Sequence, residues 1–125
     1  MSSKNLYRTV VRWDDLALED VRPGVKRAGY VTDDVMLVMN HVEPGMALNP
    51  HVHEDFDQLA YIVSGRAKYY IDGVPHEMGP GSMLLVPAGS PHYIEPYEPT
   101  LNLDIFTPPR ADLAHLAGYE KDLKK

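Results

Sequence analysis

The chain has 125 residues and carries 12 lysines and arginines against 18 aspartates and glutamates, which gives a formal net charge of −6. At 44% hydrophobic and 24% charged residues, the composition is that of a folded globular protein, and the length predicts a single domain over residues 1–125. The acidic balance argues against a nucleic-acid partner or an anionic membrane surface. The absence of cysteine excludes disulfide bonds, thiolate metal ligands and a cysteine nucleophile.

The first residues of the given sequence are not expected to form a secretory signal. Residues 1–11 include Lys4 and Arg8 and lack the apolar stretch of a secretory signal. The longest apolar runs, such as residues 35–39, are far too short to span a bilayer. We therefore expect a cytoplasmic protein without a membrane-spanning segment.

The predicted secondary structure is a series of short strands separated by turns. Residues 14–20 are expected to form one or two helical turns. Strands are expected over residues 28–32, 35–42, 59–63, 67–71, 74–78, 83–86, 92–95 and 101–106. Residues 112–124 carry Leu113, Leu116 and Leu123 on one side of a helix and are expected to form a short amphipathic helix.

Glycine-containing turn signals recur every eight residues through the middle of the chain, at Ser64-Gly65, Asp72-Gly73, Pro80-Gly81 and Ala88-Gly89. Asp72-Gly73 is typical of a two-residue type I′ hairpin, because both central positions of that turn need a positive φ. The regular spacing of the turns is typical of an antiparallel all-β sandwich or barrel.

Three histidines and one glutamine form a candidate metal site. His51 and His53 are separated by one residue, so in an extended segment their side chains lie on the same face. Gln58 enters the next predicted strand, and His92 begins a later one, so both can line the same cavity of a closed sheet. Four nitrogen and oxygen donors suit one divalent transition metal ion with open positions for water or substrate. Iron, nickel, zinc and manganese all fit this donor set.

The last predicted strand has one mixed and one apolar face. The mixed face carries Asn102, Asp104 and Phe106, and the apolar face carries Leu101, Leu103 and Ile105. Asp104 is a candidate for proton transfer, and the alternative is a solvated carboxylate or an ion pair with Arg110. Arg110 is a candidate clamp for a substrate anion, because a guanidinium holds a carboxylate in a bidentate fork.

The spacing of these residues resembles the paired motifs of the cupin superfamily. The matching positions are Gly45, His51, His53, Gln58 and Gly65 in the first stretch, and Gly81, Pro87, Gly89 and His92 in the second. The resemblance implies a cupin-type double-stranded β-helix, or jelly-roll barrel, with a metal ion in its lumen, a short N-terminal extension and a short C-terminal helix. It also implies a homodimer, which an apolar outer strand face favours. The chain departs from the usual motifs at Gln58, where glutamate is usual, and at Pro96, where asparagine is usual.

Further stretches resemble the small single-domain cupins of pectin and alginate breakdown. They are Trp13-Asp14-Asp15-Leu16, Arg22-Pro23-Gly24-Val25 and the ending Asp104-Ile105-Phe106-Thr107-Pro108-Pro109-Arg110. Members of that group convert 4,5-unsaturated hexuronates to linear 5-keto-4-deoxyuronates. The resemblance implies that Asp104, Phe106 and Arg110 belong to the active site, beside the four metal ligands.

Three classes of function are open on these observations. The first is a metal-dependent isomerase or ring-opening enzyme that acts on an unsaturated uronate or a related oxo acid. The neutral Gln58 leaves more positive charge on the ion than a carboxylate would, which favours an anionic or enolisable substrate oxygen. The second is a non-haem metal dioxygenase, although the carboxylate of the usual facial triad is missing. The third is a cupin that binds a small molecule without converting it.

The tyrosines of the predicted strands do not discriminate among these functions. Tyr61, Tyr69, Tyr70 and Tyr93 are interpreted as packing residues, because tyrosines fit the half-buried surface of a sheet.

Overall fold

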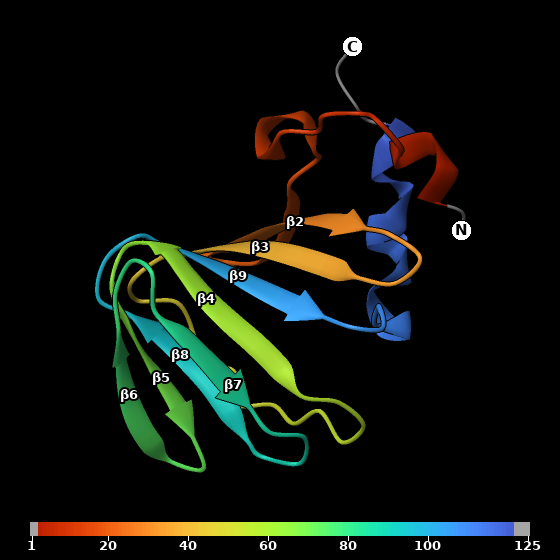
Figure 1. Ribbon diagram of the computed structural model, residues 1–125. Coiled ribbons are helices and arrows are strands. Elements are labelled where there is room, and N and C mark those ends of the chain that lie inside the picture. Colours follow the sequence, from red (N-terminus) through yellow and green to blue (C-terminus); the bar gives the residue numbers. More distant parts are fainter. Residues whose placement is uncertain (1–2, 122–125) are drawn as a thin grey trace.

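The computed structural model describes residues 3–121, which form two antiparallel β-sheets (Figure 1). Within these residues the larger sheet has six strands in the order β1-β2-β3-β9-β4-β7, and the smaller has three in the order β6-β5-β8. The larger sheet contains β1 (Glu19–Arg22), β2 (Val25–Val31), β3 (Met36–Val42), β4 (Gln58–Ser64), β7 (Met83–Val86) and β9 (Thr100–Phe106). The smaller sheet contains β5 (Ala67–Ile71), β6 (Val74–Met78) and β8 (His92–Pro96).

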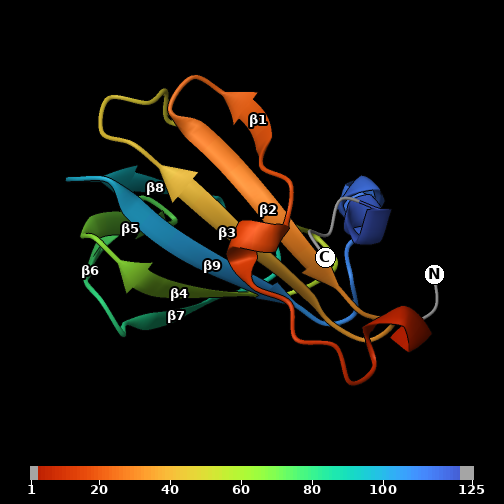
Figure 2. The same cartoon turned by 90° about the horizontal axis from the view of Figure 1, so that it is seen from above.

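Short 3-10 helices flank the sheets at the two ends of the described chain. They are η1 (Ser3–Leu6), η2 (Trp13–Asp15) and η3 (Ala111–Lys121). Figures 1 and 2 show η3 beside β2, on the side of the molecule away from the smaller sheet. Gly29 of β2 permits this close approach, because a Cβ atom there would lie 2.8 Å from the Cβ atom of Leu116. None of the helices in residues 3–121 is long and apolar enough to cross a bilayer.

The apolar core is divided into clusters that leave room for a polar interior between them. One cluster joins the two sheets and consists of Ala60, Ile62, Tyr69, Met78 and Val86. Another lies where β2, β3 and β9 meet η3 and consists of Leu6, Leu16, Ala28, Val31, Met36, Val38, Phe106, Leu113 and Leu116. Burial of apolar surface in these clusters is the main force that holds the sheets and η3 in place.

The predicted strands are present, and three of them, residues 67–71, 74–78 and 83–86, have the predicted bounds. The hairpin at Asp72-Gly73 is also confirmed. Asp72 has a φ of 52° and Gly73 a φ of 79°, the positive values that a type I′ turn requires at both central positions. Periodicity and turn chemistry therefore predicted the strands between residues 58 and 86 correctly. A meander of these strands is not found, because β5 pairs with β6 whereas β4 pairs with β7 in the other sheet.

One of the two helix predictions was wrong, and the other is confirmed as a short helix of the 3-10 type. The helix expected over residues 14–20 is limited to η2, and Glu19 to Arg22 form strand β1 instead. The prediction was wrong because this segment finds its hydrogen-bond partners on β2, where Glu19 lies opposite Arg27. The C-terminal helix is a 3-10 helix with a non-helical backbone at Leu113 (φ −113°, ψ 21°). Burial of Leu113 against the core sets the path of this segment, and its predicted end at residue 124 lies outside the described residues.

Glu19 links β1 to β2 and to η3. Its carboxylate accepts hydrogen bonds from Arg27 Nε at 2.9 Å and from His115 Nε2 at 3.0 Å. The Arg27 hydrogen bond is the main cause that lowers the pKa of Glu19 from 4.5 to about 2. A carboxylate with a lowered pKa stabilises the fold above its unfolded-state pKa, and that contribution is lost as the pH falls from 4.5 towards 2.

We therefore expect Glu19→Gln to lower the melting temperature at neutral pH by about 2–5 °C. The difference from the wild type should shrink steadily as the pH is lowered from 4.5 to about 2. Thermal unfolding of both proteins across this range measures the effect. A difference that does not change with pH would contradict the assignment of the stabilisation to the ionised carboxylate.

Candidate metal centre and its cavity

Three histidines from two separate parts of the chain meet at one point. His51 and His53 lie in the loop before β4, and His92 begins β8. An isolated β-bridge joins the loop to β8, with His51 N donating to His92 O at 3.1 Å and His92 N donating to His51 O at 3.0 Å. One ring nitrogen from each of the three histidines lies within 4.8 Å of the other two. The structure therefore brings together the three histidines that the sequence spacing singled out.

Gln58 completes this group of donors. Its Oε1 atom lies 3.0 Å from His53 Nε2 and 3.2 Å from His92 Nε2. Its amide nitrogen donates to the hydroxyl of Tyr69 at 2.9 Å, which directs the amide oxygen towards the histidines. Tyr69 was interpreted as a packing residue, and it does pack in the core between the sheets. It also orients a candidate ligand, a role that no spacing in the sequence indicated.

The second nitrogen of two imidazoles is held by the backbone. His51 Nδ1 lies 2.8 Å from the carbonyl oxygen of Asn49, and His92 Nδ1 lies 2.9 Å from that of Ser90. A carbonyl accepts and does not donate, so both Nδ1 atoms carry the proton and both Nε2 atoms present a lone pair to the site. Burial lowers the pKa of His92, and burial, followed by the nearby Arg110 charge, lowers the pKa of His53 to about 4.

These donors fit a divalent metal ion. In the neutral His92 ring, the Nε2 lone pair faces the amide oxygen of Gln58 at 3.2 Å, so two acceptors face each other. A cation between them satisfies both, and the carbonyl bonds to Nδ1 are the usual hydrogen bonds that orient histidine ligands. Three nitrogens and one neutral oxygen suit a borderline transition metal.

Asp104 lies on the cavity side of β9 together with two amides. It accepts hydrogen bonds from Asn40 Nδ2 at 2.9 Å and from Asn102 Nδ2 at 3.0 Å. Burial raises the pKa of Asp104 to about 6, against the opposing effect of hydrogen bonds from Asn102, Gln58 and Asn40. Asn40 was not among the predicted site residues. Asn40 and His41 interrupt the otherwise apolar run of residues 35–42, which was the signal that could have revealed it. In the structure Asn40 lies directly opposite Asn102.

Arg110 reaches the cavity from the segment that follows β9, but its ion-pair partner is Asp112 rather than Asp104. Arg110 Nε donates to Asp112 Oδ1 at 3.0 Å, and the guanidinium lies over the rings of Phe56 and Phe106, 5.5 Å and 5.0 Å from their centroids. Phe106 is buried and meets the His53 ring edge-on at 6.2 Å between centroids. The alternative of an Asp104–Arg110 ion pair is therefore not the arrangement found.

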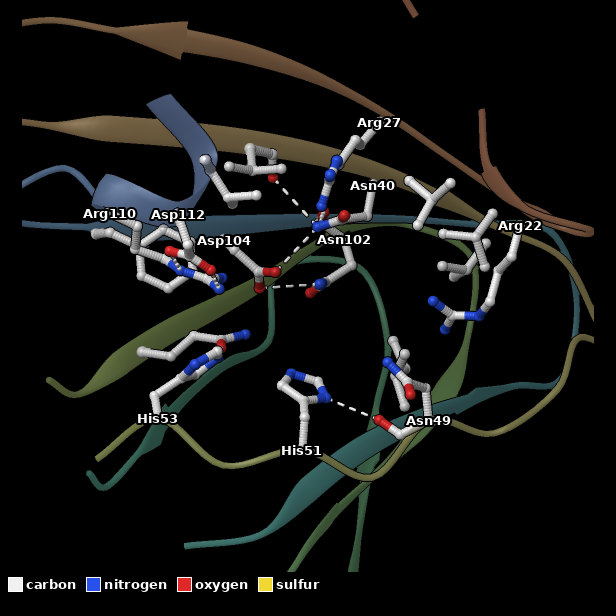
Figure 3. A pocket seen from close by; sticks show the side chains of 18 of the residues that line it. Arg22, Arg27, Asn40, Asn49, His51, His53, Asn102, Asp104, Arg110 and Asp112 are labelled. Atoms are coloured by element: carbon white, nitrogen blue, oxygen red, sulfur yellow. Dashed lines mark hydrogen bonds and ion pairs between the residues drawn. The ribbon is translucent and has the colours of Figure 1, made fainter. Parts of the chain in front are cut away.

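A cavity of about 410 Å³ connects these groups. Figure 3 shows His51 and His53 on one side, Asp104 with Asn40 and Asn102 on the other, and Arg110 and Arg22 entering from opposite ends. Its size is in the range of small-molecule sites in proteins. The cavity is also lined by Arg22, Arg27 and Asn49, none of which was predicted to have a role in the site.

Comparisons with known proteins agree with this architecture. Residues 38–102 match the family model described as "Cupin domain". The chain is 30% identical over 101 residues to the pectin degradation protein KdgF of Dickeya dadantii, a match that covers 79% of this chain and 92% of that protein. It is 28% identical over 122 residues to protein SchB of Streptomyces halstedii, covering 86% of this chain and 88% of that protein.

The solved structure of KdgF from Halomonas sp. has the same fold. It superposes with a TM-score of 0.77 at 30% sequence identity, over 84% of this chain and 97% of that chain. This likeness confirms the predicted jelly-roll architecture. The chain therefore belongs to the cupin superfamily.

Proposed function

We propose that the protein is a metal-dependent isomerase that opens the ring of a 4,5-unsaturated uronate or a closely related oxo acid. The observation that carries this proposal is that one cavity holds both a histidine cluster fit for a metal ion and the buried carboxylate of Asp104. The similarity to two KdgF proteins, one of them named for pectin degradation, supports the choice of substrate class.

The proposed ligands of one divalent transition metal ion per chain are His51, His53, Gln58 and His92. When bound, the ion supplies a Lewis acid that polarises a substrate oxygen and favours its enolate form. All four ligands are neutral, so none of them offsets the charge of the ion. The proposed site therefore favours an anionic or enolisable small molecule.

The proposed reaction is an isomerisation and needs no co-substrate. The bond between C1 and the ring oxygen breaks, the C1 hydroxyl loses its proton as the aldehyde forms, and the enol left at C5 becomes a ketone when C4 gains a proton. We propose that Asp104 transfers this proton, because one carboxyl group can accept it from the hydroxyl and donate it to C4. Asn40 and Asn102 hold the Asp104 carboxylate in place through the two hydrogen bonds described above.

Arg110 and Phe106 complete the proposed active site. Arg110 is proposed to hold the substrate oxygen on which negative charge develops, since its guanidinium lies beside Asp104 and His53 and affects the pKa of both. Phe106 forms an apolar wall between His53 and Arg110 that excludes water from the reacting atoms.

The test is elemental analysis of protein purified without added metal, followed by assays of unsaturated uronates and oxo acids with and without oxygen. We expect one divalent ion per chain, and loss of the ultraviolet absorbance of the conjugated double bond at the same rate in both atmospheres. Uptake of oxygen with turnover would identify a dioxygenase instead. A bound ion without turnover of any of these compounds would favour a cupin that only binds its ligand.

A homodimer is the second part of the proposal. The outer face of the larger sheet carries a continuous set of apolar side chains, Leu59, Tyr61, Met83, Leu85, Leu103 and Ile105. Met83 and Leu85 of edge strand β7 are 68% and 59% exposed, and symmetric association of two copies is the commonest way to cover such a surface.

Light scattering should therefore give twice the mass of one 14.0 kDa chain. The double variant Met83→Glu, Leu85→Glu should be a folded monomer, because it places charge on the apolar edge without touching the core. A wild-type protein that stays monomeric at all concentrations would refute this prediction.

The cytoplasmic location stays a prediction, to be checked by fractionating the producing cells.

A further inference from the structure

A cation without a partner lies in the same cavity as the histidines. Arg22, the last residue of β1, lines the cavity, and its Nε atom is buried without a hydrogen-bond partner. The other two arginines of the cavity are neutralised, Arg27 by Glu19 and Arg110 by Asp112. None of the ion pairs found in residues 3–121 involves Arg22. Arg22 is therefore the cation whose charge the described part of the cavity leaves uncompensated.

A β-bulge directs Arg22 towards the cavity. Asp20 lies opposite Lys26 and Arg22 lies opposite Val25, so Val21 is an extra residue in β1. Lys26 and Val25 are neighbours on β2 and face opposite sides of the sheet, and their partners on β1 do the same. Lys26 faces the solvent, with its amine 3.9 Å from Asp20, whereas Val25 is buried and lines the cavity. Arg22 accordingly shares the cavity side, as Figure 3 shows.

Asn102 presents an acceptor to the same cavity. Its Nδ2 atom donates to Asp104 at 3.0 Å, and its Oδ1 atom is buried without a partner. In the described residues, Arg22 Nε and Asn102 Oδ1 are the buried side-chain polar atoms that lack a hydrogen bond. Both residues line one cavity. Buried polar atoms without partners are rare in folded proteins, and a bound ligand is one way to satisfy them.

We propose that Arg22 binds the carboxylate of the ligand and that Asn102 Oδ1 accepts a hydrogen bond from one of its hydroxyl groups. The cavity would then bind a hydroxy acid with its carboxylate beside β1. This assignment rests on the proposed function, because a uronate is a hydroxy acid. A guanidinium presents its donors in a planar fork that matches a carboxylate. The carboxylate binds Arg22 rather than Arg110, because Asp112 already occupies the fork formed by Nε and Nη2 of Arg110 and leaves its other donors for a single substrate oxygen.

The test compares a sugar acid with its neutral ester. The two ligands are galacturonate and its neutral methyl ester, which differ only at the acid group. Neither has the double bond that reacts, so titration calorimetry with the metal-loaded protein measures binding without turnover. We expect the wild type to bind the acid more tightly than the ester. Arg22→Gln should weaken binding of the acid about 10- to 100-fold and binding of the ester little, which is the usual effect of removing a hydrogen-bonded charge.

Matched controls separate this effect from a loss of structure. Lys26→Gln removes an exposed cation of β2 that lies outside the cavity lining, and this variant should bind both compounds as the wild type does. Arg22→Gln should keep its metal and melt no lower than the wild type, because an unpaired buried charge costs free energy in the folded state. If the glutamine variant does not fold, Arg22→Lys decides, because it keeps the charge but loses the planar fork and should weaken binding of the acid severalfold.

Three results would overturn or limit the assignment in different ways. If the Arg22 variants bind the acid as the wild type does, the proposal is wrong whatever the wild type converts. If Arg110→Gln shows the acid-specific loss and Arg22→Gln does not, the carboxylate lies at Arg110 and the proposal is again wrong. If Arg22 discriminates the acid from the ester but the unsaturated uronate is not converted, the proposed reaction fails and the acid site stands.

Discussion

Replacing His51 and His53 together with alanine is expected to remove the bound metal completely. The two residues supply half of the four proposed donors, and the remaining pair, Gln58 and His92, rarely suffices to retain a borderline divalent ion. Metal content should fall from one ion per chain to background after dialysis against a chelator. The wild type should also gain thermal stability when the metal is added, whereas the double variant should gain none, because a ligand stabilises a fold only through a site that the fold contains.

His41→Ala is the matched control, since His41 lies on β3 outside the candidate cavity. It should keep the full metal content. A double variant that still held one ion per chain after the same dialysis would place the metal elsewhere. The proposed reaction would then lose its Lewis acid, and the histidine cluster would be a packed group of neutral rings.

The second large effect is expected at Asp104. Asp104→Asn keeps the size of the side chain but cannot transfer a proton, so turnover should fall about 10²–10⁴-fold, the usual contribution of a positioned acid or base. The metal content should not change, because the carboxylate is not one of the proposed ligands. Asn40 and Asn102 donate to different oxygens of Asp104, so in the variant one of these two amides would face an amide nitrogen, and a small shift in melting temperature is expected.

Turnover, metal content and melting temperature must be measured on the same preparations. Asp14→Asn, which changes an exposed carboxylate of η2, should leave all three near the wild-type values. Full activity of Asp104→Asn would show that another group transfers the proton. A loss of activity that followed a loss of metal would instead make Asp104 a positioning residue for the ligand Gln58, whose amide contributes to lowering the pKa of Asp104.

Local sequence patterns were sufficient to predict those parts of the structure that depend on residues close together in the chain. The hairpin of β5 and β6 follows from the alternation of its residues and from the conformation that Asp72-Gly73 adopts. The convergence of His51 and His53 follows from their spacing of two residues in an extended segment. His92 was placed with them through the motif spacing, and the structure confirms that its ring nitrogen joins theirs.

The features that could not be predicted depend on contacts between distant segments. Strand β1 contains a bulge, so its side chains do not alternate regularly, and its pairing depends on Arg27 eight residues later. Asp112 was assigned to the first turn of a helix, and nothing in the spacing indicated that it would pair with Arg110. Tyr69 reaches Gln58 from the other sheet, a contact that depends on how the two sheets are packed.

The histidine cluster lies where the two sheets meet, so a metal ion bound there would affect the local separation of the sheets. Gln58 begins β4 of the larger sheet and His92 begins β8 of the smaller one, so the proposed ion, if held by both, would cross-link the layers. Separation of the layers at this edge would first have to release the ion, so its binding free energy would add to the free energy of local opening. The amide hydrogens in the bridge between His51 and His92 should then exchange with solvent about 100-fold more slowly when the free ion is present at about 100 times its Kd. The concentration of free metal would thus set the fraction of time for which the two sheets are separated at this edge.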